Sequence, residues 1–143
     1  MLMVSLKVKK LHPDAKIPHY AHPHDAGMDL FALEHVIVPA GGRALIGTGI
    51  AMEIPEKYVG LVWDKSGLSN SHGLKTLGGV IDAGYRGEIK VGVVNLGQED
   101  YVIGAGHKIA QMLIQKVKHA EITLVDDLSP SGRGENGFGS TGK

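Results

Sequence analysis

Five short segments of this chain hold more glycine, charged and hydroxyl residues than a strand or turn needs, and they are the places where chemistry could occur. In the segment GGVIDAGYRGEI (78–89), Asp82 follows two apolar residues and precedes a tight turn at Ala83-Gly84. A carboxylate held at a strand end beside a turn can be aimed at a water molecule, so Asp82 is the best general-base candidate. An ordinary hairpin with an Asp in its turn is the alternative interpretation.

A second segment, WDKSGLS (63–69), has the composition of an anion-binding site. A strand runs into Lys65, Ser66 and Gly67, and a short helix is expected over 66–72. Backbone N–H groups at a helix N-terminus, with a hydroxyl and a cation beside them, bind anions. Ser66 as a simple N-cap is the competing interpretation.

The C-terminal segment RGENGFGSTG (133–142) has the residue types of a nucleotide-binding tail. Glycine lets the backbone approach a phosphate closely, while Arg133, Ser140 and Thr141 supply donors. Phe138 offers a flat surface on which a base can stack. The spacing is not that of a P-loop. We interpret this segment as a disordered tail that becomes ordered over a nucleotide, with plain disorder as the alternative.

Two further segments place polar groups within strands. Asp29 begins a strand in AGMDLFA (26–32), a position where Asp usually serves a turn or cap. Lys108 and Gln111 interrupt an otherwise apolar strand in GHKIAQ (106–111), so one of them should face something that uses it. A solvated strand face is the alternative.

The elements expected to position these residues are short strands. Runs rich in Val and Ile are separated by Gly or Pro, and glycine makes up 21 of 143 residues, about twice the usual ~7% share. This pattern predicts an all-β fold, a jelly-roll-like barrel or sandwich. The expected strands cover residues 4–10, 29–33, 35–38, 43–46, 48–54, 57–64, 88–96, 107–117 and 120–125.

Composition excludes several classes of protein. With 143 residues the chain has the size of one domain, and 15 basic residues balance 15 acidic ones. A neutral chain gains little electrostatic attraction to nucleic acid or an acidic membrane, so neither partner is expected. The absence of cysteine excludes disulfides, thiolate zinc sites and Cys nucleophiles. No run is apolar enough for a membrane span or a signal peptide, so we expect a cytoplasmic protein.

Taken together and in this order, the five segments resemble the five motifs of the trimeric deoxyuridine triphosphatases (dUTPases), from residue 26 to residue 142. The resemblance implies a jelly-roll homotrimer whose sites each take pieces from all three chains, with a β core at 1–128 and a flexible lid at 129–143. It implies hydrolysis of dUTP to dUMP and pyrophosphate with magnesium, which limits dUTP and supplies dUMP for thymidylate synthesis. Trimer formation would also compensate for the small core of a short chain.

The resemblance assigns roles to the residues at the reacting centre. Asp82 would orient and deprotonate the water that attacks the α-phosphorus, and Gln111 would hydrogen-bond that water or the α-phosphate. Tyr85 would pack beneath the deoxyribose and exclude a ribose 2′-OH. Asp29 would hold magnesium through its water shell.

The remaining implied contacts are with the substrate's phosphates and base. They are Lys65, Ser66 and Gly67 on the phosphates, Gly79, Ile81 and Lys90 around the uracil, and Arg133, Phe138, Gly139, Ser140 and Thr141 in the tail. Within the tail, Arg133 would pair with the γ-phosphate and Phe138 would cap the uracil. The family's usual Arg is replaced here by Lys65, which keeps the charge but loses the bidentate fork.

Three other interpretations stay open on sequence grounds. A dCTP deaminase would need a Glu near Gly92, where this chain has none; Glu88 lies earlier in the strand. A non-catalytic nucleotide-binding jelly-roll module would not need a placed base. The cluster His19, His22 and His24 could bind zinc or nickel, with solvated loop histidines as the alternative.

Overall fold

The computed structural model describes residues 3–142, and the all-β prediction is confirmed there. Ten strands and one short helix are formed. Residues 1, 2 and 143 of the expected single domain lie outside the described range. The strands are β1 (Lys7–Lys10), β2 (Met28–Phe31), β3 (Val36–Val38), β4 (Arg43–Glu53), β5 (Tyr58–Trp63), β6 (Leu74–Leu77), β7 (Val80–Ile81), β8 (Glu88–Asn95), β9 (Tyr101–Ile103) and β10 (Lys108–Lys116), and the helix is α1 (Ser66–His72).

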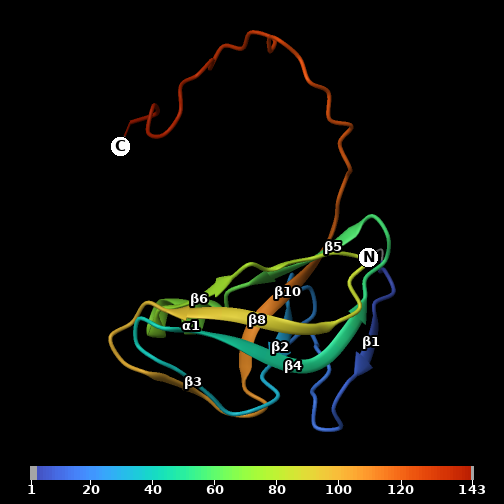
Figure 1. Ribbon diagram of the computed structural model, residues 1–143, viewed down its shortest axis with the longest axis vertical. Helices are drawn as coiled ribbons and strands as arrows, with labels where there is room; N and C mark the ends of the chain where they lie inside the picture. Colours follow the sequence, from blue (N-terminus) through green and yellow to red (C-terminus); the bar gives the residue numbers. More distant parts are fainter. Residues whose placement is uncertain (1–2, 143) are drawn as a thin grey trace.

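The strands form two four-stranded sheets and a small two-stranded one (Figure 1). The first sheet has the order β1-β4-β8-β6, the second has the order β2-β10-β5-β7, and β3 pairs with β9. All the paired strands are antiparallel. Strand neighbours are mostly distant in sequence, so the fold brings the chemistry-bearing segments together through long-range pairing.

Alternation of apolar and polar residues explains why these strands form. In β8 the side chains of Ile89, Val91 and Val93 point into the core, while Lys90 on the same strand faces outward. The inward set packs with buried residues of the second sheet, such as Leu30, in one hydrophobic core. Each such buried aliphatic side chain contributes roughly 1.5–3 kcal/mol, which fixes the register of the outward residues.

Three local expectations were wrong. Residues 120–125 form no strand and are exposed, because no neighbouring strand pairs with them. Segment 78–89 is not a hairpin, since β7 pairs with β5 in the second sheet and β8 pairs with β4 and β6 in the first. Gly78 and Gly79 turn the chain out of β6 with φ angles of 69° and 110°, which favour glycine. The list of expected strands also omitted β6, β7 and β9.

The last strand, β10, ends at Lys116, and the rest of the described chain, up to residue 142, carries no helix or strand. In Figure 1 this orange-to-red tail leaves the body of the molecule and arcs away from it. Ile122, Leu124 and Leu128 are almost fully exposed along it. None of the helical residues in the described range belongs to a segment that could cross a membrane.

Candidate active site

Strand β10 aligns polar residues from three of the predicted segments. It lies between β2 and β5, and its Gln111 is in register with Asp29 on one side and Trp63 on the other. Lys65 follows directly after β5, so it reaches the same end of the sheet. The second sheet therefore brings the segments 26–32, 63–69 and 106–111 together in one copy of the chain.

Asp29 is the electrostatic centre of this group. Its side chain is 2% exposed, and Lys65 Nζ donates to its Oδ1 at 2.6 Å. Lys108 Nζ lies 2.9 Å from Oδ2 in an ion pair outside hydrogen-bond geometry. Burial alone would raise the pKa of Asp29, but the two ammonium groups outweigh burial and hold this pKa below its ordinary value. The sequence singled out Lys108 as a cation within an apolar strand, but no site role was predicted for it.

Gln111 is oriented by the backbone beside it. Its Nε2 donates to the carbonyl of Asp64 at 2.8 Å, and Gly27 packs so closely against its side chain that a Cβ there would collide with it. Gln111, Trp63 and Ser66 line a surface hollow of about 430 Å³. Ser66, predicted to bind phosphate, and Gln111, predicted to bind the water, thus line the same surface hollow.

The start of α1 carries the predicted anion-binding residues. Lys65 is the N-cap, Ser66 is the first helical residue, and no side chain caps the first turn. The expectation that Ser66 is the cap was therefore wrong. Ser66 and Gly67 are exposed, so their backbone and the hydroxyl remain accessible to a ligand.

Asp82 lies at the other end of the same sheet. It follows β7 directly and is exposed, and no hydrogen bond or ion pair among residues 3–142 holds its carboxylate. Its carbonyl accepts a hydrogen bond from the Tyr85 backbone N–H at 3.1 Å, which forms the turn. The Tyr85 hydroxyl donates to the carbonyl of Glu88 at 2.8 Å and so fixes the phenol ring.

The residues predicted to bind uracil do not all line one hollow. Lys90 lines an open hollow of about 470 Å³ together with Gly78, Leu45 and Leu77. Gly79 and Ile81 lie on the chain that leaves this hollow, and the Gly79 carbonyl accepts from the Val62 backbone N–H at 2.8 Å, so this carbonyl is not free for a base. The sheet pairing explains the difference, because β7 turns toward β5 instead of returning along β8.

In a single copy, Asp82 lies apart from Lys65 and Lys108, the two lysines that pair with Asp29 and are called the lysine group below. Ile81 pairs with Gly60, so Asp82 comes to the position opposite Val59, while Trp63 and Lys65 lie toward the opposite end of β5. Val59 and Trp63 are four residue steps apart, about 13 Å at ~3.3 Å per residue. A general base must lie within hydrogen-bond reach of the proton that it removes, about 3 Å. Within one copy, Asp82 therefore lies about 13 Å along the strand from Trp63, next to which a phosphate at Lys65 would bind.

The tail residues also stay away from the body of their own copy. Arg133 Nε donates to the carbonyl of Asn136 at 2.6 Å within the tail, and Phe138 is fully exposed. Ser140 and Thr141 are exposed as well. Gly139 has a φ of 98°, so this part of the tail follows a path that suits glycine.

The described residues do not form a preformed metal site. No group of three or more His, Cys, Asp or Glu side chains converges between residues 3 and 142, and the cluster His19, His22 and His24 is no exception. The ring of His19 instead stacks on Phe31 at 5.3 Å. Both oxygens of Asp29 face ammonium groups, so neither is free to ligate magnesium directly, while the expected contact through the water shell of the ion stays a prediction.

A family model and a curated protein match the part of the chain that contains these segments. The family model described as dUTPase matches residues 13–142. The chain is similar to the deoxyuridine 5'-triphosphate nucleotidohydrolase of Clostridium acetobutylicum, with 47% identity over 142 residues that cover 98% of each chain.

Two solved structures also resemble the chain. A variant dUTPase of Staphylococcus bacteriophage 80alpha with dUpNHpp has a TM-score of 0.93 and 32% identity, covering 99% of this chain and 100% of that one. A variant dUTPase of phage phi11 of S. aureus, described with a structural Mg(II) ion, has a TM-score of 0.81 and 30% identity, covering 87% and 98%.

Proposed function

Because this chain belongs to the dUTPase family, we propose that it hydrolyses dUTP to dUMP and pyrophosphate with Asp82 as the general base. The observation that carries the role of Asp82 is its position: an exposed carboxylate at the end of β7, held by no other described side chain. Asp82 takes a proton from water as the water oxygen bonds to the α-phosphorus. The bond from that phosphorus to the bridging oxygen breaks, and pyrophosphate leaves with the electron pair.

The active site in this proposal is shared among three copies of the chain. The separation of Asp82 from Lys65 along β5 supports sharing, because about 13 Å of strand lies between Trp63 and the position opposite Asp82. The exposed apolar residues Leu45, Leu77 and Val80 also support it, since a homotrimer could cover them. One copy supplies Asp82 and Tyr85, a second supplies the lysine group and Gln111, and a third supplies the tail.

Phosphate binding is assigned to the second copy. Lys65 keeps donors free beyond its bond to Asp29, and it is joined by the Ser66 hydroxyl and the Gly67 N–H. Gln111 is held by the Asp64 carbonyl and its side chain lines the hollow, where it would hydrogen-bond the attacking water or the α-phosphate. When bound with the triphosphate, magnesium would take its direct ligands from phosphate oxygens and would neutralise part of their charge.

Specificity follows from the turn and from the tail. The ring of Tyr85, anchored at Glu88, gives the sugar a flat surface without an acceptor, so a ribose 2′-OH loses its hydrogen bonds there. Main-chain groups near Gly79 and Ile81 and the strand around Lys90 receive the uracil. Phe138 of the tail stacks over the base, while Arg133 and the segment Gly139–Thr141 close over the phosphates.

The proposal is tested by substrate profiling. We expect pyrophosphate release from dUTP but not from UTP, dTTP or dCTP, and no ammonia from dCTP, which a deaminase would release. Asp82→Asn should keep binding of a non-hydrolysable dUTP analogue while losing nearly all turnover. Full turnover by that variant would remove Asp82 as the base. The cytoplasmic location expected from the sequence stays a prediction.

A further inference from the structure

The turn that carries Asp82 connects the two sheets and has little regular structure of its own. It runs from the end of β7 at Ile81 to the start of β8 at Glu88, and these strands belong to different sheets. Its one main-chain hydrogen bond joins Tyr85 N–H to the Asp82 carbonyl. A loop with so few internal bonds needs support from side chains to hold a base in place.

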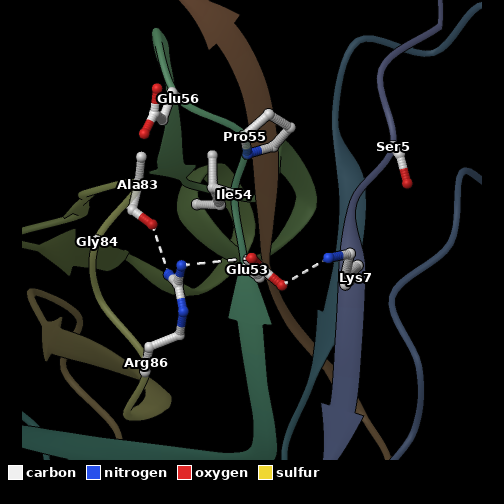
Figure 2. Close-up of a pocket in the computed structure, with 9 residues that line it drawn as sticks. All are labelled: Ser5, Lys7, Glu53, Ile54, Pro55, Glu56, Ala83, Gly84 and Arg86. Atoms are coloured by element: carbon white, nitrogen blue, oxygen red, sulfur yellow. Dashed lines mark hydrogen bonds and ion pairs between the residues drawn. The ribbon is translucent and has the colours of Figure 1, made fainter.

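Arg86 supplies this support from inside the turn. One terminal nitrogen of its guanidinium, Nη1, donates to the carbonyl of Ala83 at 2.6 Å and to the carbonyl of Tyr85 at 3.1 Å. Figure 2 shows the side chain reaching across the turn toward Ala83 and Glu53. Charge-assisted hydrogen bonds of this kind are about twice as strong as neutral ones. Arg86 therefore bridges both limbs of the turn.

The same guanidinium ties the turn to the first sheet. Its Nη2 lies 3.6 Å from Glu53 Oε1 at the end of β4, and Glu53 Oε2 lies 3.0 Å from Lys7 Nζ on β1 (Figure 2). The three side chains are between 46% and 73% exposed, so the ion pairs themselves contribute little energy. They give the guanidinium a contact with β4 in addition to its two bonds to carbonyls.

We propose that Arg86 is a positioning residue for the general base: it holds the Asp82–Gly84 limb of the turn so that the Asp82 carboxylate points at the attacking water. The inference rests on the proposed role of Asp82. Tyr85 is anchored separately, since its hydroxyl donates to the Glu88 carbonyl. Loss of Arg86 should then disturb the base more than it disturbs the sugar-binding ring.

The test compares Arg86→Gln and Arg86→Lys with the matched control Lys7→Gln, which leaves both carbonyl bonds in place. We expect kcat to fall at least about tenfold in Arg86→Gln, with binding of a non-hydrolysable dUTP analogue within about twofold of the wild type. Arg86→Lys should recover part of the rate, because one ammonium can bond one carbonyl but lacks the planar fork. Lys7→Gln should keep the wild-type rate within about twofold.

A double variant separates positioning from a general structural role. If Arg86 acts through Asp82, adding Arg86→Gln to Asp82→Asn costs little further rate, whereas an independent role would give the full additional loss. Wild-type kcat in Arg86→Gln, an equal loss of analogue binding, or additive losses would overturn the inference. If Arg86→Gln fails to fold, Arg86→Lys decides by the same readouts. A wild-type protein that leaves dUTP intact would contradict the proposed function instead.

Discussion

Asp29→Asn tests the electrostatic core of the site, because it removes the charge of a buried carboxylate with almost no change in shape. Asp29 is the counter-ion of two ammonium groups, Lys65 at 2.6 Å and Lys108 at 2.9 Å. An asparagine can accept a hydrogen bond from one of them but neutralises neither. In the variant, the ammonium groups of Lys65 and Lys108 lie beside an uncharged, buried amide and repel each other.

The size of the effect follows from distance and exposure. At about 3 Å and an effective dielectric constant of 20, Coulomb's law gives roughly 6 kcal/mol per pair. The desolvation of Asp29 offsets part of this, and the lysine side chains are 29% and 47% exposed, so they can turn toward water. We therefore expect about 1 kcal/mol per pair, or about 2 kcal/mol in total.

The assay is urea unfolding at a fixed protein concentration, because the stability of an oligomer depends on concentration. A loss of about 2 kcal/mol lowers the urea midpoint by about 1 M at a typical slope of ~2 kcal/mol per M. Asp126→Asn, an exposed position in the tail, is the matched control and should unfold like the wild type.

The pH dependence has a definite sign. The folded pKa of Asp29 is lowered, so its stabilisation is complete above the unfolded pKa and is lost as pH falls through the folded pKa. The wild type and Asp29→Asn should differ by a constant amount at neutral pH and converge well below about pH 4. Equal midpoints at pH 7, or a difference that persists unchanged at low pH, would refute the counter-ion role.

Three further predictions concern the tail, the turn and the sugar. Deleting residues 130–143 should leave a folded oligomer with little activity, checked by size-exclusion chromatography and pyrophosphate release; full activity would contradict the lid. Gly79→Ala should lower the free energy of unfolding by more than about 1 kcal/mol in urea titration, because φ is 110° and the added Cβ would lie 2.8 Å from the Val62 carbonyl oxygen. Tyr85→Ala should reduce the preference for dUTP over UTP about tenfold or more in kcat/KM; unchanged preference would exclude sugar recognition by this ring.

Local patterns in the sequence were enough to predict the strand-rich class and many of the strands. In β8, alternate burial of Ile89, Val91 and Val93 follows directly from alternate apolar residues. Strand β6 was missed because its four residues, LKTL, do not alternate between apolar and polar side chains. Only Leu74 among them is buried. The strand expected at 120–125 has the right residues but no partner, and a sequence does not reveal whether a partner is available.

Within the site, the residue types were predictable but their partners were not. The pairing of Asp29 with Lys65 and Lys108 depends on the order β2-β10-β5, which long-range pairing sets. The same sheet continues from β5 to β7, so Ile81 of β7 pairs with Gly60 of β5 and the expected hairpin does not form. From the sequence, Arg86 could be recognised only as a charged residue. Its bond to the Ala83 carbonyl depends on the path of a turn that connects two sheets, which local sequence patterns do not predict.

Mixing two inactive variants is the most direct test of a site shared between copies. Asp82→Asn supplies an intact tail, and the chain without residues 130–143 supplies an intact Asp82. After dissociation and reassembly at equal amounts, a site that draws these parts from different copies of a trimer should be complete in about one case in four. The account predicts recovery of about a quarter of wild-type activity, while a mixture that stays as inactive as its components would contradict it.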